Sequence, residues 1–240
     1  MTFNNRTAVI TGAAGRIGRA AAREFARHGV NLFLTDINME KLQQLTDELQ
    51  NQAITVVPLY MDVSSSESIR QTVQEIFNQT DRVDILFNNA GAWPKGSALD
   101  CSMEDFRSIV NLNLDSVFLL SQLFGRKMKE QNYGRIINTA SIAGEVGLPG
   151  FCAYSVAKAG VIMLTKVMAM ELGKNSVTVN CISPGMIKDE KVPISGTWLG
   201  RSGTGDEIAR AVVFLAADEA GYITGADLPV DGGRILGPKS

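Results

Sequence analysis

The sequence predicts an α/β fold: a doubly wound parallel sheet of seven strands with helices on both faces. Short, β-rich apolar runs alternate with longer segments of helical periodicity from one end of the chain to the other. The apolar runs are continuously hydrophobic, which is typical of parallel strands covered on both faces. No repeats, low-complexity tracts or linkers interrupt this pattern. We therefore expect residues 1–240 to form a single domain.

The elements follow one another in a regular order. Strands are expected at residues 6–11, 31–36, 54–62, 83–89, 135–141 and 177–185, with a last short one within 226–233. Helices are expected near 15–28, 38–51, 65–79, 103–131, 154–173 and 206–217. Pro229 places the last strand at a sheet edge, because proline cannot donate to a ladder. Capping boxes are expected at two helix starts, Ser64 with Glu67 and Ser102 with Asp105.

Composition narrows the classes of function. The net charge is −2, and without runs of Lys or Arg we expect no nucleic-acid or membrane partner. The N-terminus leads directly into the first strand pattern, and the three cysteines lie far apart, so we expect a reduced, cytoplasmic protein. The single histidine, His28, is interpreted as a helix C-terminal cation. Histidine triads are therefore not expected, and no cluster of side chains has metal-ligand spacing.

A glycine-rich turn joins the first strand to the first helix and reads TGAAGRIG, residues 11–18. Glycines there let the backbone approach a pyrophosphate, which lies at the helix N-terminus. A tight turn without a ligand is the alternative, but its position favours a dinucleotide site. Asp36 ends the second strand, where a carboxylate accepts the ribose hydroxyls and repels a 2′-phosphate. Asp62 and Val63, which end the third strand, are expected beside the adenine.

Tyr154 and Lys158 lie four positions apart in the predicted helix 154–173, so they share one face. Ketone reduction by hydride needs a proton, and the reverse reaction needs that proton removed. Tyrosine titrates at about pH 10, and a lysine ammonium one turn away favours the phenolate. The pair therefore suits acid/base chemistry. The alternative is a packing tyrosine beside a lysine whose charged end reaches solvent.

Further motifs stand in the order and spacing of a known family: NNAG at 88–91, NLDSVF at 113–118, Ser141, PGMI at 184–187 and VDGG at 230–233. With the glycine turn and the Tyr154–Lys158 pair, they make the sequence resemble the short-chain dehydrogenase/reductase family over essentially its whole length. The resemblance implies a Rossmann-type fold and an NAD(P)(H)-dependent oxidoreductase that interconverts a secondary alcohol and a ketone by hydride transfer. The sequence is similar to 3-oxoacyl-carrier-protein reductases and to sugar or steroid alcohol dehydrogenases alike. A 3-oxoacyl-thioester reductase and a catalytically silent dinucleotide sensor are therefore the alternatives.

The resemblance also implies roles for single residues. Tyr154 would be the acid/base, Lys158 would also hold the nicotinamide ribose, and Ser141 would orient the substrate oxygen. Asn113, inside the predicted helix 103–131, would relay protons through ordered water to Lys158. NAD is expected in preference to NADP. The cofactor is expected to contact Gly12, Gly15, Arg16, Ile17, Gly18, Asp36, Asp62, Val63, Asn89, Gly91, Tyr154, Lys158, Pro184, Gly185 and Ile187.

The glycine turn departs from the family pattern at one position. Arg16 occupies the middle glycine of T-G-x-x-x-G-x-G, and Gly15 stands one residue earlier. We expect Gly15 to take the positive φ that the turn requires. We also expect Arg16 to reach toward the adenosine, which leaves NADP as a second possible cofactor.

The segment after the sixth strand also departs from the family pattern. Asp189 stands where most relatives have the threonine that holds the nicotinamide amide. Pro193 and Gly196 break any helix in the short stretch that follows. We therefore expect a shortened, mobile substrate lid near 188–201 and an open nicotinamide end. The alternative is a loop that folds down over the cofactor with Trp198 as its anchor.

Two further expectations concern partners. The loop residues able to specify a substrate, each of which could equally be loop packing, are Trp93, Lys95, Glu145, Phe151 and Trp198. An aromatic pair with one lysine would suit a compact polar or anionic carbonyl compound. A homotetramer or homodimer is expected because two helices carry excess apolar surface, through Val117, Leu120, Phe124, Val161, Leu164 and Met168. The helix methionines are interpreted as core residues, namely Met103, Met128, Met163, Met168 and Met170.

Overall fold

A seven-stranded parallel sheet forms the centre of the computed structural model, which describes Phe3, residues 5–50 and residues 53–237. The strand order is β3-β2-β1-β4-β5-β6-β9. The chain runs outward from β1 to β3 and then returns to place β4 beside β1, so the switch point lies between β1 and β4. The prediction of a doubly wound sheet is confirmed, with strands β1 (Thr7–Thr11), β2 (Asn31–Asp36), β3 (Val56–Tyr60), β4 (Ile85–Asn88), β5 (Gly134–Thr139), β6 (Val177–Pro184) and β9 (Asp227–Val230). Pro229 lies in the edge strand β9, as expected.

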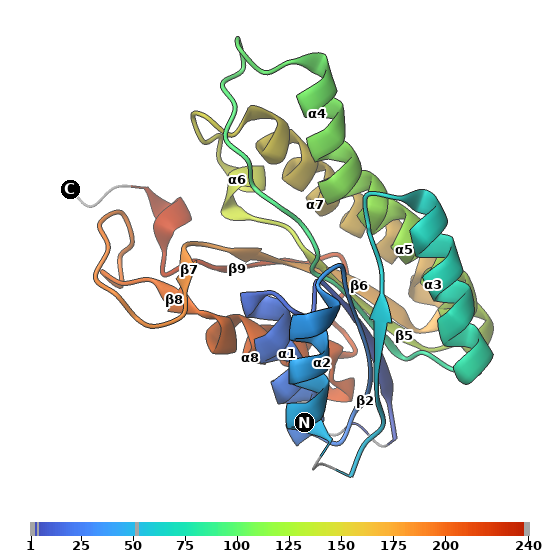
Figure 1. Ribbon diagram of the computed structural model, residues 1–240. Helices are drawn as coiled ribbons and strands as arrows, with labels where there is room; N and C mark the ends of the chain where they lie inside the picture. Colours follow the sequence, from blue (N-terminus) through green and yellow to red (C-terminus); the bar gives the residue numbers. More distant parts are fainter. Residues whose placement is uncertain (1–2, 4, 51–52, 238–240) are drawn as a thin grey trace.

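Helices cover both faces of the sheet (Figure 1). One face carries α1 (Arg16–Arg27), α2 (Met39–Leu49) and α8 (Gly205–Ala216). The other carries α3 (Ser66–Gln79), α5 (Ser116–Gln131) and α7 (Cys152–Leu172). The short α6 (Ile142–Glu145) follows β5, and α4 (Met103–Val110) extends beyond the sheet at the top of the view.

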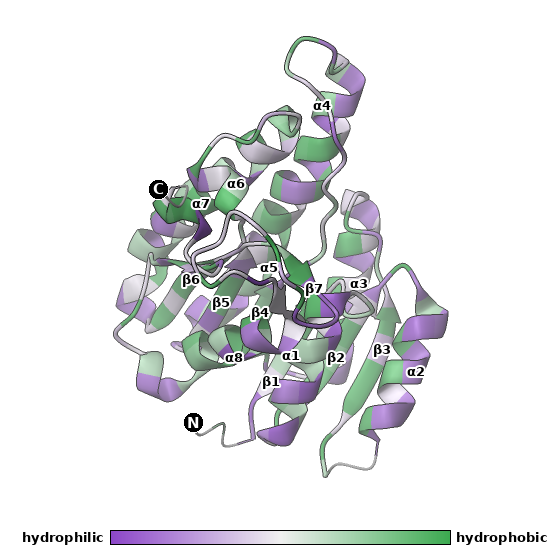
Figure 2. Cartoon of the chain, turned by 90° about the vertical axis from the view of Figure 1, so that its left-hand side faces the viewer, coloured by the Kyte–Doolittle hydropathy of each residue, from purple (hydrophilic) through white to green (hydrophobic). Residues whose placement is uncertain are grey.

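Two apolar cores lie on opposite sides of the sheet. Successive strand side chains point to opposite faces, so Ala8 and Ile10 pack in one core while Val9 packs in the other. The first core includes Phe25 of α1, and the second includes Phe124 of α5. Figure 2 shows the central strands mostly in the hydrophobic colour, whereas α2 alternates between hydrophobic and hydrophilic residues. This pattern matches strands that are buried on both faces.

The helix expected at 103–131 is interrupted between α4 and α5 by a π-helical stretch, Asn111–Asp115. Such single-turn insertions are frequent at functional sites. Asn113 stands at the centre of the stretch and is fully buried. The helical pattern of apolar residues carries no signal for the insertion, so the sequence predicted one continuous helix.

Side chains cap two of the helices, one as expected and one differently. Ser102 caps α4, as predicted. For α3, however, the cap is Ser65, whose side chain accepts a hydrogen bond from an N–H of the first turn. Ser64 instead donates a 2.7 Å hydrogen bond to Asp62 in the preceding turn. The Ser64–Glu67 capping box is therefore wrong, because Ser64 belongs to the turn after β3.

The outer surface of α5 and α7 differs from the expectation. Most of the residues expected at a subunit interface are buried inside the protomer, namely Val117, Leu120, Phe124 and Val161. Helical periodicity finds an apolar face, but in helices that are apolar on several sides it does not tell which side meets the sheet.

Met128 is in the core, whereas three methionines assigned to the core are exposed: Met103, Met163 and Met170. The exposed large apolar side chains of α5 and α7 are Phe118, Val156, Met163, Val167 and Met170.

One helix among the described residues is long and apolar enough to cross a membrane, Cys152–Asn175. It contains α7, which packs along β6 and α6 as part of the sheet cover. The same test is passed by core helices of ordinary globular domains, and the position of α7 on the sheet fits that interpretation.

Candidate active site

The turn between β1 and α1 depends on two glycines. Gly12 has φ +63°, and a Cβ there would lie 2.8 Å from the Cα of Ala90. A Cβ on Gly18 would meet the Gly12 carbonyl and lie 2.7 Å from the Cα of Ala13. Gly15 has φ −75° as the N-cap of α1, so the expectation that it takes the positive φ is wrong. Gly12 does so instead, because the chain reverses there, before the helix entry.

The N-terminus of α1 is open to an anion. Gly15 offers no side-chain cap, and the first turn contains no acidic residue. The first N–H groups of a helix have no partner inside it, and together with the helix dipole they attract a phosphate. The tight glycine cradle and the uncapped helix together fit the pyrophosphate of a dinucleotide.

Asp36 is fixed beside this turn at the end of β2. Its Oδ2 accepts a hydrogen bond from the Ala14 amide at 3.0 Å, and its Oδ1 accepts one from the Asn38 amide at 2.9 Å. The carboxylate therefore cannot swing away from the turn without breaking both bonds. Its position fits the ribose-binding acid of a dinucleotide site.

Arg16 is bound to the lid segment. Its Nε and Nη2 donate to the two carboxylate oxygens of Asp189 at 2.7 and 3.0 Å. Its Nη1 donates to the carbonyl of Ile187 at 3.3 Å. The expectation that Arg16 reaches toward the adenosine stays a prediction; in this arrangement a carboxylate on the lid segment holds the guanidinium. The ion pair also keeps the pKa of Asp189 below its usual range.

Tyr154, Ser141 and Lys158 come together where β5 meets α6 and α7. Ser141 caps α6, accepting a 3.1 Å hydrogen bond from the Ala143 amide, and its hydroxyl is near enough to the Tyr154 phenol to lower the pKa of that group. Lys158 is buried, and its Nζ donates a 2.7 Å hydrogen bond to the carbonyl of Thr139. The Nζ lies 5.6 Å from the centroid of the Tyr154 ring. The structure thus places the serine and the lysine around one tyrosine.

Burial is the main cause of the pKa shifts of Tyr154 and Lys158. It raises the pKa of Tyr154, and the nearby Ser141 hydroxyl offsets part of that rise. Burial also lowers the pKa of Lys158 to about 8. The sequence analysis expected the Lys158 ammonium to favour the Tyr154 phenolate. In the protein alone, the pKa of Tyr154 is raised instead. Burial disfavours the charged forms of both Tyr154 and Lys158. At their separation, the attraction between phenolate and ammonium is too weak to offset that cost.

Asn113 faces Lys158 across Gly91. The Asn113 Nδ2 donates to the carbonyls of Ala92 and Ile109 at 3.0 and 3.1 Å. Within the described part of the chain its buried Oδ1 has no hydrogen-bond partner. A Cβ on Gly91 would lie 2.7 Å from that Oδ1 and 3.7 Å from the Lys158 Nζ. A glycine there keeps open the space between a free acceptor and an ammonium group.

Most of the remaining cofactor candidates lie at or just after the carboxyl end of a strand. Asn89 donates from its Nδ2 to the carbonyls of Thr11 and Gly12, so it braces the glycine turn. Gly185 follows β6 and packs against Asp231, where a Cβ would lie 2.8 Å from the Cα. Val63 follows β3 and is buried. Ile17 is the second residue of α1, and Asp62, Pro184 and Ile187 complete the set.

Comparison with known proteins decides the family. A family model described as "Enoyl-(Acyl carrier protein) reductase" matches residues 12–234. The 3-oxoacyl-[acyl-carrier-protein] reductase FabG of Thermotoga maritima is 35% identical over 98% of this chain and 100% of that protein. The chain belongs to the short-chain dehydrogenase/reductase family. This family consists of oxidoreductases that bind a nicotinamide dinucleotide.

Two other similar proteins differ in what their names say they act on. The (2S)-[(R)-hydroxy(phenyl)methyl]succinyl-CoA dehydrogenase subunit BbsD of Thauera aromatica is 37% identical over 98% of this chain and 99% of that protein. The crystal structure of acetoin dehydrogenase YohF from Salmonella typhimurium has a TM-score of 0.93 at 33% identity, covering 97% of this chain and 98% of that one. One name refers to an acyl thioester and the other to a small hydroxyketone.

The lid of this short-chain dehydrogenase/reductase is a loop on a two-stranded ribbon. The strands are β7 (Ile187–Lys188) and β8 (Gly203–Thr204). Residues 189–202, all of which the structure describes, contain no helix. The Leu199 amide donates to the Gly232 carbonyl at 3.1 Å, and a Cβ on Gly233 would lie 3.2 Å from the Trp198 side chain. The loop therefore has more anchoring contacts than the mobile segment expected from the sequence.

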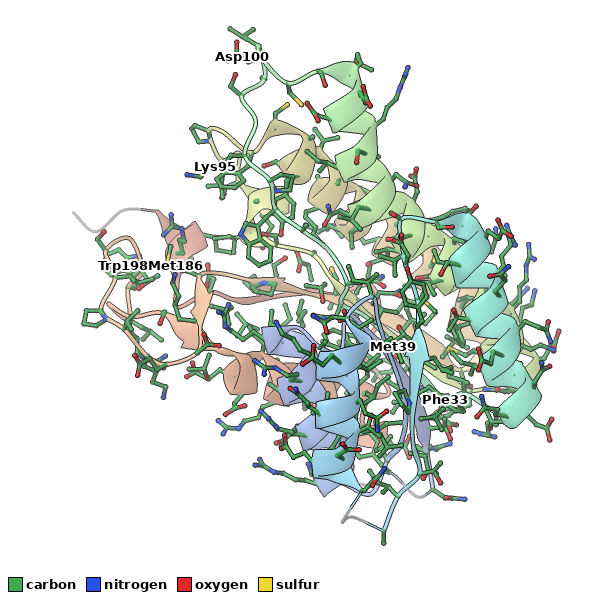
Figure 3. All side chains as sticks on the ribbon, in the orientation of Figure 1. Phe33, Met39, Lys95, Asp100, Met186 and Trp198 are labelled. Atoms are coloured by element: carbon green, nitrogen blue, oxygen red, sulfur yellow. The ribbon has the colours of Figure 1, made fainter. Side chains whose placement is uncertain are left out.

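The substrate candidates lie on several segments around this edge. Figure 3 shows Lys95 on the segment between β4 and α4, and Trp198 with Met186 on the β7–β8 side of the molecule. The Phe151 ring stands edge-on to Tyr154, with centroids 6.5 Å apart. The remaining two, Trp93 and Glu145, are exposed.

Sequence reasoning missed the backbone groups that position the site. The carbonyls of Thr139, Ala92 and Ile109 hold Lys158 and Asn113. Every residue type carries a carbonyl, so no sequence pattern points to these three. It also missed the capping box of Thr204 and Glu207 at α8, although the T-x-x-E spacing was available as a signal. Among the described residues, no group of three or more His, Cys, Asp or Glu side chains could hold a metal ion.

Proposed function

We propose that this short-chain dehydrogenase/reductase interconverts a secondary alcohol and a ketone with NAD(H), using Tyr154 as the acid/base. The observation that carries the proposal is the grouping of Tyr154 with Ser141 and, one helical turn away, Lys158, at the same end of the sheet as the open N-terminus of α1. The bound cofactor would supply or accept the hydride. The residues around it would hold the substrate oxygen and move its proton.

Each side chain has a task that its contacts support. A carbonyl oxygen that accepts hydrogen bonds from the hydroxyls of Tyr154 and Ser141 would be polarised and oriented for reduction. A neutral tyrosine is the proton donor in that direction, and burial keeps Tyr154 neutral by raising its pKa. Lys158 and the free Oδ1 of Asn113 border one space beside Gly91. A water in that space would pass a proton between the lysine and the protein exterior.

The preference for NAD over NADP rests on Asp36 and Arg16. A 2′-phosphate would meet the carboxylate that the Ala14 and Asn38 amides hold at the end of β2. Arg16, the side chain best placed to neutralise that phosphate, is bound to Asp189 instead. Both observations favour an unphosphorylated adenosine ribose.

A 3-oxoacyl-thioester reductase is the second candidate, supported by the names of the Thermotoga and Thauera relatives. A catalytically silent dinucleotide sensor has less support, because it has no use for Asn113, Ser141, Tyr154 and Lys158 together. We further propose a cytoplasmic homotetramer or homodimer. The outward apolar side chains of α5 and α7 support the assembly.

The test follows NADH consumption by its near-ultraviolet absorbance with a panel of carbonyl compounds. The panel contains small hydroxyketones and diketones, cyclic ketones, and 3-oxoacyl thioesters. Turnover of small ketones supports the proposal, and turnover of thioesters alone favours the second candidate. Cofactor binding without turnover of any compound would favour the sensor.

A further inference from the structure

The two positions at which this chain departs from its family pattern are in contact. Arg16 stands in the glycine turn and Asp189 on the lid, and their side chains form a two-pronged ion pair. The third guanidinium nitrogen donates to the Ile187 carbonyl, in the first lid strand. Planar pairing of this kind between a guanidinium and a carboxylate fixes geometry as well as charge.

The ion pair lies where the lid meets the pyrophosphate turn. The ribbon β7–β8 lies beside the start of α1, since a Cβ on Gly205, next to β8, would come within 2.9 Å of the Arg16 carbonyl. The far end of the lid rests on the C-terminal segment through Leu199 and Gly232. The Arg16–Asp189 pair therefore joins the lid to the turn that, in the proposed function, holds the pyrophosphate.

We propose that Arg16 and Asp189 form a latch that retains the dinucleotide, and that the latch opens when the cofactor enters or leaves. This inference rests on the proposed function, because it needs a pyrophosphate at the N-terminus of α1. Arg16 begins that helix, so its ion pair with the lid starts next to the helix N-terminus at which the phosphates would lie. The side chains of Arg16 and Asp189 are 35% and 74% exposed. An exposed pair is weak enough to open in each turnover.

The first experiment measures the release of NADH by stopped-flow fluorescence in the wild type, Arg16→Gln, Asp189→Asn and the double variant. Each single substitution is expected to speed release roughly two- to fivefold, the scale of an exposed ion pair. The double variant is expected to match the single ones, because either change alone opens the latch. Arg23→Gln is the control, since Arg23 of α1 forms an equally two-pronged pair with Glu48 of α2, away from the lid.

The second experiment needs no cofactor. Trypsin cleavage after Lys191, within the lid, is followed in the protein without nucleotide. Faster cleavage in Arg16→Gln and Asp189→Asn than in the wild type and Arg23→Gln supports the latch. Cleavage and release rates equal to those of the control would overturn it, as would effects that add in the double variant. If the wild-type protein binds no NADH, the proposed function is contradicted. The role of the latch in retaining the dinucleotide is then contradicted too, whatever the cleavage rates.

Discussion

The ammonium nitrogen of Lys158 donates a 2.7 Å hydrogen bond to the carbonyl oxygen of Thr139 at the end of β5. Lys158 is only 3% exposed, and one neutral carbonyl compensates little of the cost of burying a charge. Burial accordingly lowers the pKa of Lys158 to about 8. The bond to Thr139 fixes the Nζ beside the Tyr154 ring.

This burial predicts a pH dependence of stability. Between about pH 8 and the ordinary lysine value of 10.5, the unfolded chain binds a proton that the folded chain has lost, so the contribution of Lys158 to stability rises with pH. The free energy of unfolding of the wild type relative to Lys158→Met is expected to rise over that window by up to about 3 kcal/mol, and to stay level below it. Denaturant titrations of both proteins at several pH values provide the measurement. A level difference across the window would contradict the buried, depressed lysine.

The glycine turn predicts the effect of one added methyl group. Gly18→Ala would press a Cβ onto the Gly12 carbonyl and the Ala13 Cα, so the turn must shift. We expect a loss of stability of about 1–3 kcal/mol and a large loss of NADH affinity, measured by denaturation and fluorescence titration. Gly173→Ala is the control, because none of the residues that the structure describes lies within 4 Å of a Cβ there. Equal NADH affinity in Gly18→Ala and the control would refute the turn as the pyrophosphate site.

Removing the charge of Asp36 is expected to weaken discrimination between the two cofactors. Asp36→Asn keeps an oxygen acceptor beside the turn but no longer repels a 2′-phosphate. The ratio of kcat/KM for NADPH to that for NADH should rise at least about tenfold, a change of about 1.4 kcal/mol. Asp47→Asn, on the exposed side of α2, serves as the control. A wild-type enzyme that already prefers NADPH would show that Asp36 does not set the preference.

The outward face of α7 predicts an oligomer. Val156, Met163, Val167 and Met170 are exposed and lie at helical spacing on α7, and an apolar stripe of this kind is usually covered by another surface. We expect light scattering at micromolar concentration to give the mass of a dimer or tetramer, and Met163→Glu to lower it. Met39→Glu, a partly exposed methionine on α2, is the control. A monomeric wild type would contradict the assembly.

Much of the fold was predictable because each strand is a separate apolar run between helical patterns. β1 and β2 were predicted to within one residue, since a glycine turn and Asp36 mark their ends. The grouping of Ser141 with Tyr154 and Lys158 came from motif spacing and the family resemblance, and the structure brings the three together.

What the sequence did not predict depends on three-dimensional neighbours. Gly12 takes the positive φ because the chain reverses there, although Gly15, as a glycine, could adopt that conformation equally well. The π-helical stretch around Asn113 depends on packing between α4, α5 and α7. The contact of Arg16 with Asp189 joins residues 173 positions apart, and a single sequence holds no information on such a pairing.

Tyr154→Phe tests the central claim most directly. The substitution removes the phenolic oxygen and leaves the ring, so the fold and NADH affinity are expected to stay unchanged. Tyr222→Phe is the control, because Tyr222 is fully exposed. With the best carbonyl substrate of the panel, we predict that kcat falls by at least about 10²-fold in Tyr154→Phe, the usual scale of acid/base catalysis. A kcat equal to that of the wild type and Tyr222→Phe would contradict the assignment of Tyr154 as the acid/base.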